Sequence, residues 1–271
     1  MRHPRLSHRD DTVNDAPPLI AVAHGSRDPR AAATVTDLLA TVRELAPGLD
    51  VRAAFLDHCA PSVGQVLGSL DGAPVTVVPL LLTAAYHAVA DIPAQLAAAT
   101  AARPGQRVAS AGTLGPHPRL LDALERRLAE AGLKVTDARE RAATSVVLAA
   151  AGSSHPAANA TVAALAARWA RERGWRAVLP AYASAAAPTP AEAVGAVRAS
   201  GSRRVVVASY LLSPGYFADK IRAGALGAGA DVVSPVLGAA PEVAEVVIER
   251  YAAAADQLAE AAAGSRGVGL G

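Results

Sequence analysis

The sequence predicts an α/β protein made of two similar βα lobes, each with a mostly parallel four-stranded sheet flanked by helices. Short apolar runs alternate with helix-like segments, which is typical of a parallel sheet covered on both faces. The alternation starts again near the middle of the chain with similar residues, which indicates two copies of one unit. With 271 residues, 52% of them hydrophobic, the chain can bury two modest cores.

The first copy is predicted to contain four strands and four helices. Its apolar runs predict strands at 19–23, 51–56, 75–82 and 107–111. The helical patterns predict helices at 30–45, 61–70, 92–102 and 118–131. A proline lies near each predicted helix start, where its missing N–H costs little. These prolines are Pro29, Pro61, Pro93 and Pro118.

The second copy follows a polar connection at 133–144. Its strands are expected near 146–150, 176–182, 204–212 and 231–235, and its helices near 157–173, 190–200, 218–226 and 241–262. The expected domains are therefore an N-terminal lobe at 18–132, a linker at 133–144 and a C-terminal lobe at 145–263. A disordered arm at 1–17 and a flexible tail at 264–271 are expected outside them.

The repeat is visible as four matching blocks in the same order. Val146–Pro156 (VVLAAAGSSHP) aligns with Leu19–Pro29 (LIAVAHGSRDP). The other pairs are 55–61 with 182–188, 81–87 with 211–217 and 114–118 with 237–241. Several scaffold residues agree, among them Gly25 and Gly152, Ser26 and Ser153, and Tyr86 and Tyr216.

The two copies disagree at histidine. If these side chains served packing, the second copy would need them too, so we interpret the first copy as carrying chemistry and the second as keeping the shape. Drift of surface histidines in an alanine-rich chain is the alternative. The pairs are His24 and Ala151, His58 and Ala185, His87 and Phe217, and His117 and Ala240.

His24 and His87 follow the first and third predicted strands. In a doubly wound sheet these two loops lie at the same edge. Two imidazoles over an open cleft suit a borderline divalent metal such as Fe²⁺, Co²⁺ or Ni²⁺, and so open a site favours metal transfer over structural binding. Neutral imidazole can also act as a base near pH 7. A plain hydrogen-bonding role remains the alternative for either histidine alone.

Further polar residues surround these loops. Gly25 and Ser26 precede a helix whose N-terminal N–H groups can bind an anion, and Arg27 and Arg30 can pair with carboxylates. For Arg30 a solvated helix position is equally open. Asp57 is a plausible carboxylate at the cleft.

Structural roles are favoured for several other polar residues. Asp57-His58-Cys59 makes a poor ligand set, because neighbours on an extended strand point to opposite sides. We favour helix capping for Asp28 and a cap or surface position for His155. His117 either lines the cleft or caps a helix.

Several function classes are disfavoured. A net charge of +2 gives no argument for nucleic acid, and the apolar stretch at 75–90, broken by Pro79 and His87, is too short for a membrane span. The single Cys59 and the lack of an apolar signal segment favour a cytoplasmic location. No Gly-x-Ser-x-Gly elbow, P-loop or dinucleotide motif occurs.

The motifs of the first half resemble the sirohydrochlorin chelatases, a family of class II tetrapyrrole chelatases. Ala23–Pro29, Ala54–Asp57, Val78–His87 and Leu114–Pro118 carry the resemblance. The duplicated second half is similar to the family's long, two-domain form. The resemblance implies two chelatase-like lobes that insert Fe²⁺ or Co²⁺, in some members Ni²⁺, into sirohydrochlorin for sirohaem or cobalamin. Metal and ring are both substrates, and no tightly bound cofactor is expected.

The resemblance also implies roles for single residues. His24 and His87 match the metal-binding histidines that accept pyrrole protons, and Asp57 stands where relatives carry the glutamate expected as a proton acceptor. We expect the second copy to lack an active site and the chain to be a monomer with an internal pseudo-dimer. A non-catalytic metal or tetrapyrrole carrier and a two-lobed small-anion binding protein remain alternatives. The residues expected to bind sirohydrochlorin are Gly25, Ser26, Arg27, Tyr86 and His117.

Overall fold

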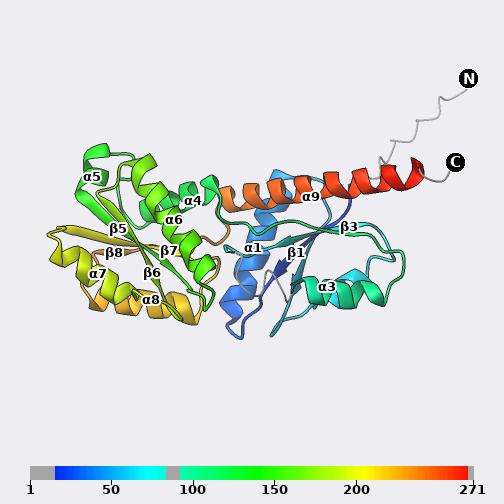
Figure 1. Cartoon of the computed structure of the whole chain (residues 1–271), viewed down its shortest axis with the longest axis horizontal. Coiled ribbons are helices and arrows are strands. Elements are labelled where there is room, and N and C mark those ends of the chain that lie inside the picture. Colours follow the sequence, from blue (N-terminus) through cyan, green and yellow to red (C-terminus); the bar gives the residue numbers. More distant parts are fainter. Residues whose placement is uncertain (1–15, 84–91, 268–271) are drawn as a thin grey trace, which may run out of the picture.

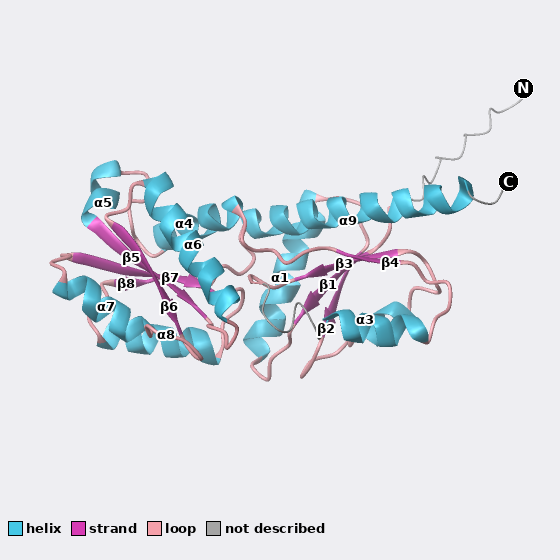
Figure 2. Ribbon diagram, viewed as in Figure 1, coloured by secondary structure: helices cyan, strands magenta, loops and turns pink. Residues whose placement is uncertain are grey.

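The computed structural model describes residues 16–83 and 92–267. Two four-stranded sheets lie along the long axis of the molecule, with helices on both faces of each (Figures 1 and 2). The strand orders are β2-β1-β3-β4 and β6-β5-β7-β8, and every neighbouring pair is parallel. The predicted fold class is therefore confirmed.

The element order repeats once along the chain. The first copy contains β1 (Leu19–Ala23), α1 (Pro29–Leu45), β2 (Val51–Phe55), α2 (Val63–Gly68), β3 (Val75–Pro79), α3 (Ile92–Ala101), β4 (Val108–Ser110) and α4 (Pro118–Glu130). The second part contains α5 (Ala138–Ala143), β5 (Thr144–Ala150), α6 (Pro156–Arg173), β6 (Ala177–Tyr182), α7 (Pro190–Ala199), β7 (Arg204–Tyr210), α8 (Tyr216–Gly227), β8 (Val232–Val233) and α9 (Pro241–Gly267).

Some predicted boundaries were wrong. The connection at 133–144 contains helix α5, capped by Asp137, whose Oδ1 accepts from Arg139 N at 2.8 Å. Helix α9 runs to Gly267, so the first residues of the expected flexible tail are helical. At the other end, the carbonyl of Pro17, the last residue of the expected arm, accepts a hydrogen bond from Tyr251 Oη at 2.8 Å, and the rest of that arm up to residue 15 lies outside the described residues.

The last helix of each copy packs on the other copy's sheet. Helix α9 contacts β3 and β4 of the first sheet and also α1, whereas α4 contacts β7 of the second sheet. Trp169 of α6 donates its Nε1–H to Glu125 of α4 at 3.0 Å. Each lobe therefore consists of one sheet and a helix from the other copy, and boundaries at 18–132 and 145–263 follow the repeat but not the packing.

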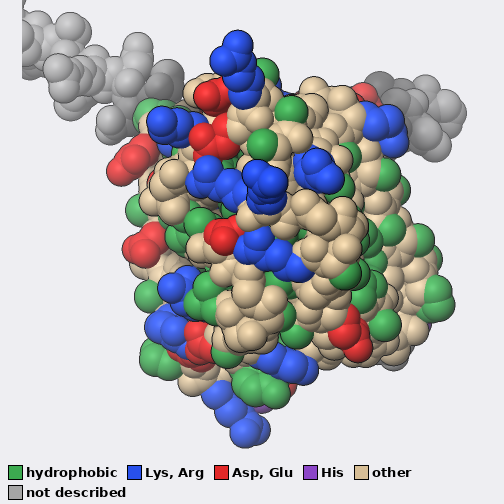
Figure 3. All heavy atoms as spheres, turned by 90° about the vertical axis from the view of Figure 1, so that its left-hand side faces the viewer, with side chains coloured by type: hydrophobic (Ala, Val, Ile, Leu, Met, Phe, Trp, Pro, Cys, Tyr) green, Lys and Arg blue, Asp and Glu red, His purple; other side chains and the backbone are tan. Residues whose placement is uncertain are grey.

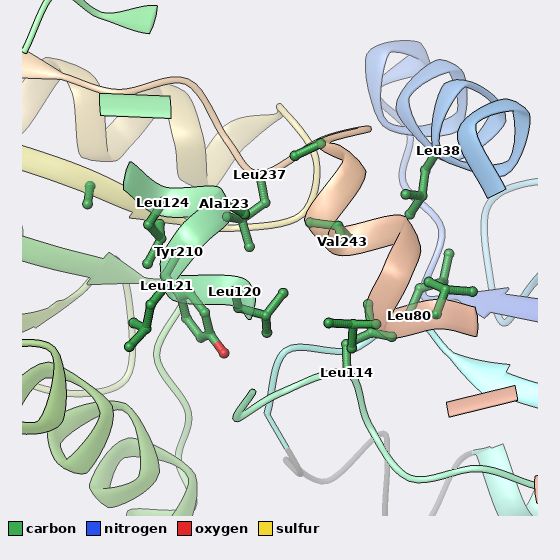
Figure 4. Close-up of a cluster of buried hydrophobic side chains, with 14 of the residues drawn as sticks. Leu38, Leu80, Leu114, Leu120, Leu121, Ala123, Leu124, Tyr210, Leu237 and Val243 are labelled. Carbon is green, nitrogen blue, oxygen red and sulfur yellow. The ribbon is translucent and has the colours of Figure 1, made fainter. Parts of the chain in front are cut away.

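The exchange joins the two lobes through one hydrophobic core. A single buried cluster contains Leu38 and Leu80 of the first copy, Val243 of α9, and Leu121 of α4 beside Tyr210 of β7 (Figure 4). Separate smaller clusters lie on the opposite face of each sheet, against α2 and α3 in one lobe and against α7 and α8 in the other.

The surface at the end of the second lobe carries charges of both signs (Figure 3). Ion pairs of that lobe include Arg198 with Asp231 and Arg204 with Glu140, both at 2.8 Å. Within residues 16–83 and 92–267, no helix is both long and apolar enough to cross a membrane.

Candidate active site

His24 is the first residue after β1, the central strand of the first sheet. The five residues of β1 are buried, and the chain becomes exposed at His24. Its carbonyl accepts a hydrogen bond from Asp57 N at 3.0 Å, which ties it to the end of the neighbouring strand β2. The predicted position of His24, at the carboxyl ends of parallel strands, is confirmed.

A cleft lies between the two lobes and consists of two adjoining pockets. The first, of about 420 Å³, is lined by the β1–α1 loop of the first copy and the β7–α8 loop of the second. The second, of about 480 Å³, is lined by the chain after β3 and by the β5–α6 loop. Apolar walls with a few polar groups are typical of small-molecule sites. The described residues that line both pockets are His24, Leu80, Leu81, Leu211, Leu212 and Phe217.

The turn after His24 requires glycine. Gly25 has φ +91°, and a Cβ there would lie 1.8 Å from the Asp57 carbonyl oxygen. Gly152 has φ +85°, and its Cβ would lie 2.0 Å from the Ser184 carbonyl oxygen. Because Ala151 stands in the place of His24 in this second, similar turn, the turn folds without a histidine.

The start of α1 carries two arginines with different surroundings. Asp28 caps the helix as predicted, since its Oδ1 accepts from Arg30 N at 2.9 Å. The Arg30 guanidinium lies 2.6 Å from the Asp28 carboxylate and 2.7 Å from that of Asp219 in α8, and hydrogen bonds to these two carboxylates raise the pKa of Arg30. Arg27, by contrast, lines the first pocket.

Asp57 and His58 form a pair at the rim of the cleft. The Asp57 carboxylate is exposed and lies 3.3 Å from His58 Nε2, while its Oδ1 accepts from His58 N at 2.7 Å. His58 lines the first pocket, whereas Asp57 is not among the described residues that line either one. Asp57 and His58 do not point to opposite sides as on an extended strand, because His58 has φ +60° and turns the chain. The expectation that Asp57, His58 and Cys59 form no metal-ligand set holds in the described part of the chain.

His117 takes the capping position. Its Nδ1 accepts from Arg119 N at 3.3 Å, and its Nε2 lies 3.1 Å from Glu249 of α9. Burial is the largest influence on its imidazole and lowers the pKa of His117. It is absent from the described lining of both pockets, so its expected role in substrate binding stays a prediction.

Two predicted site residues are not placed. Tyr86 and His87 lie outside the described residues, and Thr83, just before that gap, lines the second pocket. In the part of the chain that the structure describes, no three His, Cys, Asp or Glu side chains come together as a metal cluster.

Sequence reasoning missed several residues of the cleft. His155 occupies the N-cap position of α6, as predicted, and also lines the second pocket. Tyr216 and Phe217 begin α8 and line the first pocket, and Phe217 lines the second as well. The repeat held the signal for these two aromatic residues, because they align with Tyr86 and His87.

The fold and the cleft define a two-lobed α/β protein whose candidate ligand site lies between duplicated halves. The model of the CbiX family matches residues 18–131 and 145–254, and the chain belongs to this family. A sirohydrochlorin ferrochelatase of Priestia megaterium is 27% identical over 81% of each chain. A sirohydrochlorin cobaltochelatase of Methanococcoides burtonii is 33% identical over 78 residues, which are 28% of this chain and 60% of that protein.

Two solved structures share the fold over most of the chain. SirB from Bacillus subtilis with Fe³⁺ matches with a TM-score of 0.78 and 22% identity, over 89% of this chain and 96% of that one. CbiX, described as the terminal enzyme of sirohaem biosynthesis in denitrifying bacteria, matches with a TM-score of 0.61 and 24% identity, over 88% and 99%. At these identities the likeness establishes the fold.

Proposed function

We propose that this chain inserts a divalent metal ion, Fe²⁺ or Co²⁺, into sirohydrochlorin in the cleft between its lobes. The observation that carries the proposal is the position of His24, which lines both pockets of the cleft at the carboxyl end of the central strand. The names of its curated relatives, a ferrochelatase and a cobaltochelatase acting on sirohydrochlorin, support the same reaction.

Metal insertion asks two things of a protein. The two pyrrole N–H groups must lose their protons, and the ion must reach one face of the ring after losing water. A neutral imidazole can bind the ion and can also accept a proton near pH 7. We assign these tasks to His24 together with His87, and the leucines that line both pockets keep water away from the ring.

The proton has a route out of the cleft on this assignment. His58 lines the first pocket, and its imidazole lies 3.3 Å from the exposed Asp57 carboxylate. A proton released in the pocket can therefore pass to His58 and then to Asp57 at the surface. Asp57 would act as proton acceptor through His58 and not by direct contact with the ring.

The carboxylates of sirohydrochlorin need cationic or N–H partners. Arg27, Gly25 and Ser26 lie along the first pocket, at the N-terminal end of α1. Arg30 is already paired with two carboxylates, so Arg27 is the better candidate on this helix. We include Tyr86 in the proposed binding set because of the family resemblance.

The decisive experiment is a stopped-flow absorbance measurement of metal insertion. Full-length chain is mixed with sirohydrochlorin and Co²⁺, and the rate is compared with the protein-free reaction. We expect acceleration, and we expect His24→Ala to lower the rate about 10²–10⁴-fold, as loss of a catalytic acid–base group does. Asp37→Ala, on the exposed side of α1, is the control and should behave as wild type.

The outcomes separate the alternatives. Binding of sirohydrochlorin without any acceleration would identify a carrier. An unchanged insertion rate in His24→Ala would refute the assignment of His24. Binding of small carboxylates but not of the ring would favour an anion-binding protein.

Two further points stay predictions. A monomer is expected because the exchanged helices already join two similar lobes in one chain, and a measurement of mass in solution tests it. A cytoplasmic location is expected from the sequence.

A further inference from the structure

Two adjacent aromatic side chains are exposed in a chain that buries its others. Aromatic residues make up 3% of the sequence. Tyr216 is 73% exposed and Phe217 40% exposed, whereas the other aromatic residues that the structure describes are buried. Their ring centroids lie 5.6 Å apart at an angle of 60°. Paired exposed aromatic rings are typical of a binding surface.

The pair lies in the wall of the cleft that the second lobe provides. Both residues belong to the first turn of α8, directly after Gly215. Phe217 lines both pockets, as does His24 on the first lobe, and Tyr216 lines the first pocket. A flat ligand held between the two lobes would therefore meet His24 from the first lobe and Phe217 from the second.

The internal repeat indicates how the position of Phe217 differs between the two copies. Phe217 aligns with His87 and Tyr216 with Tyr86, so the second copy carries a phenyl ring where the first carries an imidazole. A phenyl ring cannot bind a metal ion or accept a proton, but it can stack on a conjugated ring. The loss of histidine in the second copy thus leaves a surface that is suited to the macrocycle itself.

We propose that Phe217, braced by Tyr216, stacks on the macrocycle of sirohydrochlorin, on the face turned away from His24. The inference rests on the proposed function and names a residue that positions its substrate. It gives the second lobe a direct part in binding. It also leaves the histidine side as the face by which the metal enters.

The test is equilibrium binding of metal-free sirohydrochlorin to the full-length chain, followed by the shift of the ring's absorbance bands. Phe217→Ala is expected to weaken binding about tenfold, the scale of one stacking contact and its buried area. Phe217→Leu, which keeps apolar volume without a ring, should weaken binding and reduce the band shift. Phe217→Tyr should restore both. Leu226→Ala is the matched control, because Leu226 is 42% exposed on the same helix and lines a different pocket.

Turnover provides a second readout. Phe217→Ala should raise KM for sirohydrochlorin while kcat changes little, which a general loss of folding would not produce. Wild-type affinity and KM in Phe217→Ala, or full activity with an unchanged band shift in Phe217→Leu, would overturn the stacking role and leave the metal-insertion proposal intact. A wild-type chain that fails to bind the ring would overturn both, whereas ring-dependent binding without turnover would overturn metal insertion alone.

Discussion

At the scale of single residues, the site depends on a turn that only glycine can make. Gly25 aims the chain away from β1, so that His24 stands at the mouth of the cleft, and Gly152 makes the same turn in the second copy. The histidine is therefore an addition to a turn that is stable in its own right.

Replacement of either glycine should damage the fold. Gly25→Ala introduces a Cβ 1.8 Å from a carbonyl oxygen at positive φ, and we expect it to lower the free energy of unfolding by at least about 1–3 kcal/mol. Gly64→Ala is the control, since a Cβ there meets nothing within 4 Å. Thermal unfolding measures both, and equal melting temperatures would contradict the strained turn.

Arg27 offers a test of substrate binding at the same scale. On the proposed function, Arg27→Ala should raise KM for sirohydrochlorin about tenfold with a small change in kcat, because it removes the charge-assisted contact proposed for Arg27 and a carboxylate. Arg27→Lys keeps the charge but not the forked geometry, so its KM should lie between those of wild type and Arg27→Ala. A tenfold loss of kcat at unchanged KM would place Arg27 in the chemistry instead.

The position of His24 at the end of a strand could be predicted from the sequence, whereas the position of His58 in the pocket wall could not. An apolar run that ends at a polar residue locates a strand end without further knowledge. The place of His58 depends on a left-handed backbone conformation at a non-glycine residue, for which the sequence carries little local signal. Its absence from the second copy was the available hint.

At the scale of elements, helix starts were easier to predict than strand ends. Asp28, Pro29 and Pro118 mark helix starts by a local chemical preference. Strand β3 ends at Pro79, yet the apolar run continues through Leu80 to Leu82. Leu80 and Leu81 line the cleft, and hydrophobicity alone does not separate a pocket wall from a core strand.

Helix α5 was not predicted because its residues give no hydrophobic signal. Its six residues are polar or small and none is buried, so no apolar periodicity reveals it. The cap at Asp137 holds this short turn of helix instead of packing.

The cap of α4 should make stability depend on pH. Burial, which outweighs the nearby Glu249 carboxylate, lowers the pKa of His117 below its ordinary value of about 6.5. The unfolded chain therefore binds a proton at higher pH than the folded chain does. The contribution of His117 is complete above about pH 6.5 and falls as the pH drops through that value.

His117→Asn tests this dependence, since asparagine also caps helices well. We expect the free energy of unfolding of wild type to exceed that of the variant by a larger amount at pH 7.5 than at pH 5.5. Urea unfolding at the two pH values measures this difference. A difference that grows toward low pH would mean that the folded state prefers the charged imidazole.

At the scale of the whole molecule, the exchange of α4 and α9 between the two copies is the main feature that holds the lobes together. Helix α9 covers the sheet of the first copy, and α4 contacts β7 of the second. Between the two helices, Arg119 lies 2.6 Å from both Glu245 and Glu249, and Arg126 lies 2.7 Å from Glu242. Neither copy is a complete folding unit on this arrangement.

Separate expression of the two copies should show that each depends on the other for folding. Residues 1–143 expressed alone lack α9 and should show no cooperative thermal transition, because the part of the sheet that α9 covers, at β3 and β4, is exposed. Co-expression with 144–271 should restore helix content and a complex that purifies as one species. Circular dichroism and co-purification measure these effects, and a fragment that melts cooperatively on its own near the full-length temperature would contradict the expectation.

The exchange could not be predicted from the repeat. Matching blocks identify which segments are equivalent, but an amphipathic helix has the same sequence pattern whichever of two similar sheets it covers. Two lobes, their sheets and the end of β1 followed from local patterns. Which helix completes which lobe depends on the path of the connection, and so does the width of the cleft.

The exchanged helices also bear on the history of the gene. The second copy lacks the counterparts of four histidines of the first, and a duplicated copy with no task of its own would be free to decay. Here a damaging mutation in the second copy would uncover part of the first sheet, and with it the strand that ends at His24. Selection for activity in one half therefore preserves the shape of the other, and neither half can be discarded without the loss of both.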